Sequence, residues 1–221
     1  MKPISRVVLV LAAVLLLSSG ASAATLVVNC GTVSGTTELA AAILCPQFNL
    51  LGQTLSNISI AVSGGISGSI TLTNGDNAPQ SGSGTSTTSF NFGALTGFTF
   101  VNPIYAPSFT TGPGPRSLNA GQTLTVAGLS AVGNGSLGND TTNFVPYTGA
   151  GNFTIPVSTS TFFSAGGTGG AFMAAQSSSA NSTAVVTYTY SATQATPEPA
   201  TLSLLGLGLL GFMIRRLSVG K

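Results

Sequence analysis

Polar and apolar residues alternate along much of this chain, and that period of two is what most limits its fold. Aliphatic residues alternate with Ser, Thr, Asn or Ala over residues 57–62 and again over residues 66–72. Because successive side chains of a β-strand point to opposite faces, each stretch predicts a strand with an apolar face and a polar face. The segment Ser63-Gly64-Gly65 separates the two stretches and predicts a hairpin turn.

The same alternation recurs farther along the chain. It predicts strands around residues 90–92, 98–100, 123–126, 153–157 and 186–190. Pro156 cannot donate a hydrogen bond to a neighbouring strand, so its strand is expected to be an edge strand or an irregular one. The last of these strands, in which Thr alternates with Val and Tyr, has the clearest pattern in the chain.

Helical composition is confined to Glu38–Leu44, which is typical of either a short helical turn or a strand that leads into Cys45. Three segments rich in Gly, Ser, Asn or Pro predict loops at residues 74–89, 103–115 and 133–140. Many short strands joined by such turns predict an all-β fold. We expect an antiparallel β-sandwich or jelly-roll-like single domain, with a closed barrel as the second choice.

The central part of the chain is almost uncharged. Residues 24–196 contain one base, Arg116, and three acids, Glu38, Asp76 and Asp140. With a single base, residues 24–196 cannot form a basic surface that would bind the phosphate backbone of a nucleic acid, so nucleic acid is a poor partner. The chain has no histidine, which excludes Ser-His-Asp and Cys-His catalysis.

Asp76 and Asp140 leave one catalytic alternative open, a glycosidase-like carboxylate pair. Both lie in Gly/Asn-rich segments where Asp usually caps a turn, and we prefer that interpretation. We also prefer it to a calcium site, because Asn74–Asn77 lacks the spacing and the distal Glu of a calcium loop. We therefore expect no enzymatic activity, no catalytic residue, no metal site and no cofactor.

Aromatic residues in the predicted loops are the candidates for contact with a sugar, since the chain contains no Trp. Tyr105, Phe109 and Tyr147 are the best of them, but we prefer the interpretation in which they close the ends of the core. Arg116 is expected to pair with one of the three acids, and clamping an acidic sugar is its alternative role.

The N-terminus has the parts of an export signal. Lys2 and Arg6 precede the apolar run Val7–Leu17, and Ala21 and Ala23 form an A-x-A cleavage site. Cys30 and Cys45 would then reach an oxidising compartment, where an even number of cysteines favours a disulfide. A redox or metal pair is the alternative, although the spacing is not C-x-x-C and no third ligand is evident.

The C-terminus has three parts in a fixed order. Pro197-Glu198-Pro199 precedes the apolar run Ala200–Ile214, and Arg215-Arg216 follows it. The prolines keep the backbone extended, while the arginines favour the cytoplasmic side of a membrane. As a helix, the apolar run would rise roughly 22 Å against a hydrocarbon core of about 30 Å. We therefore expect a transient anchor, with an uncleaved anchor as the alternative.

This tail resembles the PEP-CTERM sorting signal of Gram-negative bacteria, whose membrane peptidases are called exosortases. The resemblance implies recognition through Pro197, Glu198 and Pro199, a membrane stop at Arg215 and Arg216, and cleavage near the motif. It also implies transient insertion of residues 200–214 in the inner membrane. Delivery to the cell surface or extracellular matrix would follow, alongside exopolysaccharide. The chain would divide into a signal peptide, a secreted domain and a sorting signal: residues 1–23, 24–192 and 193–221.

A second resemblance covers the domain itself. The segments that begin at Phe48 and Val185, together with Tyr147–Phe163, are similar to a bacterial family called choice-of-anchor E. This resemblance implies a location and no catalytic chemistry. We expect a non-enzymatic matrix protein. The alternatives are a carbohydrate-binding module and a self-associating fibre subunit, since low charge and exposed strand edges favour self-association.

Overall fold

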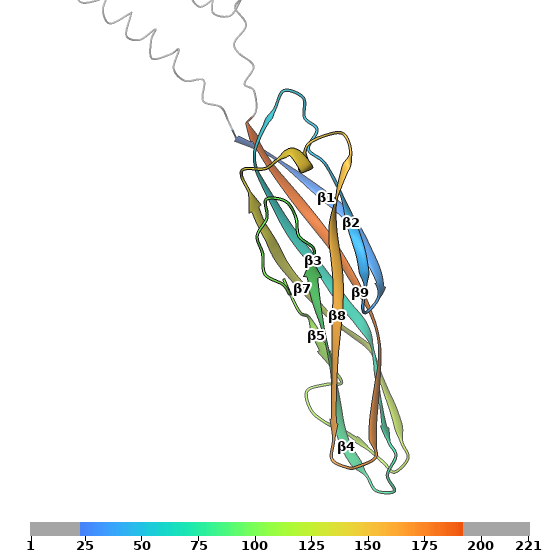
Figure 1. The fold of residues 1–221 in the computed structure, drawn as a ribbon. Coiled ribbons are helices and arrows are strands. Elements are labelled where there is room, and N and C mark those ends of the chain that lie inside the picture. The colour runs from blue at the N-terminus through green and yellow to red at the C-terminus, as the bar shows by residue number, and fades with distance from the viewer. Residues whose placement is uncertain (1–22, 192–221) are drawn as a thin grey trace, which may run out of the picture. The chain divides into compact units, whose positions relative to one another are not determined.

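A computed structural model describes residues 23–191 as two antiparallel sheets packed as a β-sandwich (Figure 1), which confirms the predicted fold class. One sheet has the strand order β1-β9-β3-β7. The other has the order β2-β8-β4-β5, and β6 also pairs with β4. The strands are β1 (Ala23–Thr36), β2 (Ala40–Pro46), β3 (Thr54–Asn74), β4 (Gln80–Phe92), β5 (Ser108–Thr110), β6 (Arg116–Leu118), β7 (Thr123–Asp140), β8 (Asn152–Gly167) and β9 (Phe172–Ser191).

The chain divides into two compact units. One contains residues 25–51 and 55–190 and therefore nearly all of the sandwich, and the other contains residues 52–54 and the two ends of the chain. A 3-10 helix, Val145–Tyr147, lies between β7 and β8. Over residues 23–191, no helix is long and apolar enough to cross a membrane.

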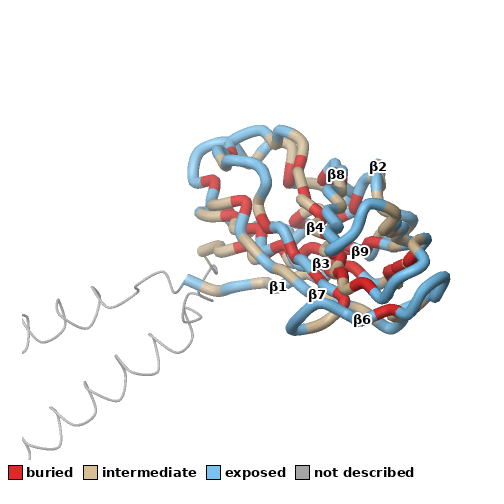
Figure 2. The backbone as a smooth tube through the Cα atoms, turned by 90° about the horizontal axis from the view of Figure 1, so that it is seen from below, coloured by how far each residue is buried: buried red, intermediate tan, exposed pale blue. Residues whose placement is uncertain are grey.

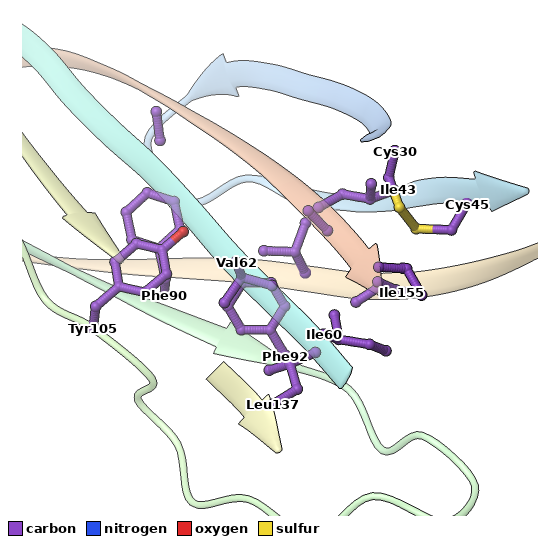
Figure 3. Close-up of a cluster of buried hydrophobic side chains, with 14 of the residues drawn as sticks. Cys30, Ile43, Cys45, Ile60, Val62, Phe90, Phe92, Tyr105, Leu137 and Ile155 are labelled. Atoms are coloured by element: carbon purple, nitrogen blue, oxygen red, sulfur yellow. A yellow bond between two sulfur atoms is a disulfide. The ribbon is translucent and has the colours of Figure 1, made fainter. Parts of the chain in front are cut away.

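The core lies between the two sheets, where the buried residues gather (Figure 2). The alternation in the sequence determines which side chains face inward: Ile58, Ile60 and Val62 of β3 are buried, while Ser59 is half-buried and Ala61 is exposed. Phe90 and Phe92 of β4 fill the space between the sheets (Figure 3). Each large apolar side chain removed from water in this way stabilises the fold by roughly 1.5–3 kcal/mol.

The predicted hairpin at Ser63-Gly64-Gly65 is wrong, because β3 runs through this segment as one continuous strand. Gly64 pairs with Gly133 of β7, and Gly65 pairs with Val132. The glycine at position 64 serves close packing instead of a turn. A Cβ atom there would collide with the carbonyl oxygen of Asn181 and lie 2.8 Å from the hydroxyl of Tyr105.

Two of the predicted loops are largely strands. Residues 80–89 belong to β4, and residues 133–140 belong to β7. The inward positions between residues 82 and 86 of β4 carry small residues because large side chains from elsewhere fill the space. A Cβ atom at Gly82 would collide with the ring of Phe172, and one at Gly84 would lie 2.9 Å from Ile70. The third predicted loop, residues 103–115, contains only the short strand β5.

Three smaller predictions were also tested. Residues 40–46 form strand β2, so the strand interpretation of the segment before Cys45 is confirmed. Residues 98–100 lie outside any strand, so the strand predicted there is wrong. Pro156 does not mark an edge strand, because β8 pairs with both β2 and β4. The carbonyl of Pro156 accepts the N–H of Gly93, which lies just beyond the end of β4. The backbone nitrogen of Pro156, which has no hydrogen to donate, therefore lies where the pairing of β8 with β4 has already ended.

The disulfide between Cys30 and Cys45 is confirmed (Figure 3). Cys30 lies on β1 of the four-stranded sheet, and Cys45 lies on β2 of the other sheet. Both cysteines are buried, so the bond joins the two layers within the core.

Candidate functional site

The residues predicted to direct export and sorting lie almost entirely outside the described residues. This applies to Ala21 of the cleavage site, to the motif Pro197–Pro199 and to Arg215 and Arg216. Ala23 is the first described residue, at the start of β1.

Asp76 and Asp140 do not form a carboxylate pair. Asp76 follows the end of β3, whereas Asp140 pairs with Ile58 near its beginning, so roughly 50 Å of strand separates them. Oδ1 of Asp140 accepts the N–H groups of Thr142 (2.8 Å) and Asn143 (3.1 Å), so this carboxylate caps a turn, as preferred. The Asp76 carboxylate accepts a hydrogen bond from the side chain of Gln80. The turn at Asp76 is capped by Asn74 instead, whose Oδ1 accepts the N–H of Asp76.

Two ionisable groups with shifted pKa values lie close together here, Asp140 at the buried end of β7 and Tyr147 in the 3-10 helix that follows. Burial alone would raise the pKa of the Asp140 carboxyl, but hydrogen bonds from Thr142 and Asn143 lower it below its usual value. Burial and the nearby Asp140 charge raise the pKa of Tyr147 to about 12. The Tyr147 hydroxyl donates to the carbonyl of Thr96 at 2.6 Å, so its polar atom is hydrogen-bonded within the core. Over residues 23–191, no group of three or more acidic, Cys or His side chains could hold a metal ion.

The aromatic residues that were candidates for sugar contact are buried. Tyr105 is only 8% exposed, its ring stacks on Phe90 with centroids 4.6 Å apart, and its hydroxyl lies 3.3 Å from that of Ser182. Phe109 and Tyr147 are buried as well. The interpretation in which these rings close the core is therefore the correct one.

Arg116 has a different partner from the one predicted. Its Nε donates to the carbonyl of Thr111 at 2.8 Å, and the side chain packs against Gly112. Among residues 23–191 it forms no ion pair with an acid, so the predicted pairing is wrong.

One aromatic residue that the sequence did not single out is exposed. Phe162 of β8 has 71% of its surface accessible, on the outer face of the second sheet. Its neighbour Phe163 is partly buried and packs against the core. The doublet itself is the signal that could have identified the site, because adjacent side chains of a strand must face opposite ways.

Hydroxyl groups surround Phe162 in register across three strands. Thr87 of β4 lies opposite Phe162 on one side and opposite Ser108 of β5 on the other. The neighbouring rows add five further residues on the same face: Ser164, Thr85, Thr110, Ser160 and Ser89. Apart from Thr110, which is 3.5 Å from the carbonyl of Gly112, none of these hydroxyls bonds another described residue. We call this surface the Phe162 face.

Glu38 places a carboxylate beside the Phe162 face. Its Oε1 accepts the N–H of Thr161 at 2.8 Å, and Glu38 lies just before β2 begins. The exposed ring can stack on the apolar side of a sugar. The hydroxyls and the carboxylate can form hydrogen bonds with the hydroxyls of that sugar.

The four-stranded sheet carries a shallow groove of about 400 Å³ on its outer face. Its lining is neutral and includes Gly65, Asn134, Asn181 and the exposed Val132. It contains no aromatic residue, so the Phe162 face offers the better platform for a sugar ring.

The decisive comparison with known proteins concerns the tail of the chain. Residues 195–217 match the PEP-CTERM protein-sorting motif. A PEP-CTERM motif implies an exported protein that an exosortase processes and that is sorted to the cell surface. The match covers the tail alone and does not extend to the similarity with choice-of-anchor E proteins.

The other comparisons add little to the PEP-CTERM match. No curated protein is significantly similar to the chain. A chain of the T13 particle of infectious bursal disease virus is 11% identical, with 76% of this chain and 35% of the viral chain covered and a TM-score of 0.22. The parasporin-2 toxin of Bacillus thuringiensis is 15% identical, with 70% and 73% covered and a TM-score of 0.11. The chain thus spans about a third of the viral chain, and TM-scores this low establish no shared fold.

Proposed function

We propose that this protein is a non-catalytic component of the cell surface or extracellular matrix that resides beside exopolysaccharide. The observation that carries the proposal is the PEP-CTERM motif at residues 195–217. The nearly uncharged sandwich and its disulfide support an extracellular location, since disulfides persist in oxidising compartments. We assign the domain to the choice-of-anchor E type, which adds a location and no activity.

The order of the tail suggests how the protein is delivered. Residues 200–214 enter the inner membrane, Arg215 and Arg216 stop further transfer, and the extended Pro197–Pro199 segment stays outside for the exosortase. Cleavage near the motif then releases the sandwich from the bilayer.

The intact mass of the exported protein tests this proposal. We expect a chain that begins at Ala24, ends near residues 197–199 and weighs two hydrogens less than the reduced form. Exported protein that still contains residues 200–214 would contradict transient anchoring.

The Phe162 face favours a second function, the binding of a neutral or weakly polar glycan. A sugar ring that stacks on Phe162 would place its hydroxyls against Thr87 and the neighbouring hydroxyl rows. The role is compatible with the first one, because a matrix protein needs a means of contact with the polysaccharide around it.

Phe162→Ala should weaken binding to the exopolysaccharide of the producing cell about tenfold, which corresponds to about 1.4 kcal/mol. Affinity electrophoresis of the exported protein in gels that contain the polysaccharide measures this change. Val132→Ala is the matched control, because Val132 is 86% exposed on the outer face of the other sheet. Equal retardation of both variants and the parent protein would remove the glycan-binding role.

A further inference from the structure

Two loops at one end of the sandwich expose aliphatic side chains to solvent. Leu51, which follows β2, is 94% exposed, and Val145, which follows β7, is 81% exposed. The loops pack on each other through backbone hydrogen bonds. The N–H of Phe48 donates to the carbonyl of Tyr147 at 2.8 Å, and the N–H of Gly149 donates to the carbonyl of Phe48 at 3.0 Å. The two aliphatic residues therefore lie in loops that contact each other, and we call residues 47–51 and 141–151 the apolar tip.

The apolar tip lies where β9 ends. The hydroxyl of Tyr188 donates to the carbonyl of Pro46 at 2.8 Å, and Ser56 at the start of β3 donates to the carbonyl of Thr189 at 3.0 Å. Figure 1 likewise shows residues 47–51 and 141–151 at the end of the sandwich where β9 finishes. The backbone therefore leaves the sandwich, after Tyr190, beside the apolar tip.

The length of chain beyond Tyr190 sets how far this end can lie from a membrane. The apolar run of the tail begins at Ala200, so residues 191–199 form the connection. Fully extended, they reach at most about 32 Å. While the tail is in the bilayer, the end of β9 stays within this distance of the lipid, and the apolar tip lies beside that end.

The apolar tip is also free of exposed charge. Residues 47–51 and 141–151 contain no acidic or basic residue, and the adjacent Asp140 is buried. Exposed aliphatic side chains in an uncharged surface suit the boundary between headgroups and acyl chains. Charged loops there would have to be stripped of water on contact with the bilayer.

We propose that Leu51 and Val145 insert into the interface of the phospholipid bilayer while the tail holds the precursor there. This inference rests on the transient anchoring in the proposed function. Contact at two points on one end orients the sandwich with the opposite end, where β3 passes into β4, directed away from the lipid. It also holds the connection with Pro197–Pro199 close to the membrane surface, where a membrane peptidase acts.

Fluorescence quenching tests the proposal, because the chain contains no Trp that would add background. Leu51→Trp and Val145→Trp would each be introduced into the precursor with its tail intact, reconstituted in phosphatidylcholine vesicles. Met173→Trp is the matched control, since Met173 is also exposed but lies at the start of β9, far from the tip. We expect brominated acyl chains to reduce emission at least twofold for the two tip variants and to leave the control unchanged.

Vesicle flotation separates this inference from the function on which it rests. Failure of the precursor to float with vesicles would overturn membrane anchoring itself. Flotation without quenching in either tip variant would overturn only the insertion of the tip. Quenching that is lost when each vesicle holds several copies of the protein would also overturn it, because a second copy would then cover the tip.

Discussion

Replacing Glu198 and Pro199 with Ala is expected to leave most of the protein in the inner membrane. The two prolines hold the segment extended, because neither can join a helix interior. Glu198 is the only charged residue between the end of the sandwich and Arg215. Without the motif the apolar run still enters the bilayer, but no cleavage releases it. Fractionation into inner membrane, outer envelope and medium measures the shift.

The matched control for this experiment is Thr193→Ala with Gln194→Ala, which alters the connection before the motif but keeps the PEP-CTERM residues. This variant should distribute as the parent protein does. If the motif variant is also exported and shortened as the parent is, the sorting role of Glu198 and Pro199 is wrong.

The second large effect concerns the disulfide. Cys30→Ala with Cys45→Ala should lower the free energy of unfolding by roughly 3 kcal/mol, the value expected for closing a loop of this size. The two residues are 15 apart in sequence and connect the first strands of the two sheets. Ala is chosen because Ser would place an unpaired hydroxyl in the core, where Cys45 is fully buried. Urea unfolding of the exported domain measures the change.

Treatment with a reductant supplies the control. The parent protein in reductant should unfold at nearly the same urea concentration as the double variant, while the variant should not respond. A difference of less than about 0.5 kcal/mol between parent and variant would show that the bond adds little to the packing already present.

The strands that alternate aliphatic and polar residues could be predicted because a side chain's position in a strand directly sets its face. The strand signal of β4 is confined to residues 90–92, and residues 80–89 have the composition of a loop for a physical reason. Its inward positions hold small residues such as Gly82 and Ser86, since Phe172 and other large side chains occupy the volume opposite. The fit between these small residues and Phe172 depends on a side chain some 90 positions away in the sequence. The composition of residues 80–89 by itself is the same as that of a loop.

Glycine accounts for the wrong hairpin at residues 63–65. Gly64 and Gly65 have the composition of a turn, yet here glycine permits Asn181 and Tyr105 to approach β3 closely. One signal in the sequence does favour the correct answer. Val62, Gly64 and Ile66 follow one another at intervals of two residues, so all three face the same side of a strand. One uninterrupted strand therefore keeps the aliphatic residues on both sides of Gly64 on the core side.

The candidate site was only partly accessible to sequence reasoning. The tail could be identified because its three parts occur in linear order, whereas Phe162 becomes prominent only once the sheet brings hydroxyls of β4 and β5 beside it. Tyr105 was a reasonable candidate by its Pro-rich surroundings. The structure places its ring against Phe90, however, because residues 104 and 105 turn back onto the end of β4.

The place of β9 has a consequence for the timing of secretion. β9 is the last strand to be synthesised, yet it lies between β1 and β3 in the middle of its sheet. A chain that is exported from its N-terminus cannot complete that sheet until residue 190 has crossed the inner membrane. Ala200, where the apolar run of the tail begins, follows only ten residues later. Under the proposed anchoring, the sandwich completes its folding at the stage when the tail enters the membrane, and the protein first becomes fully folded while it is still attached to the cell.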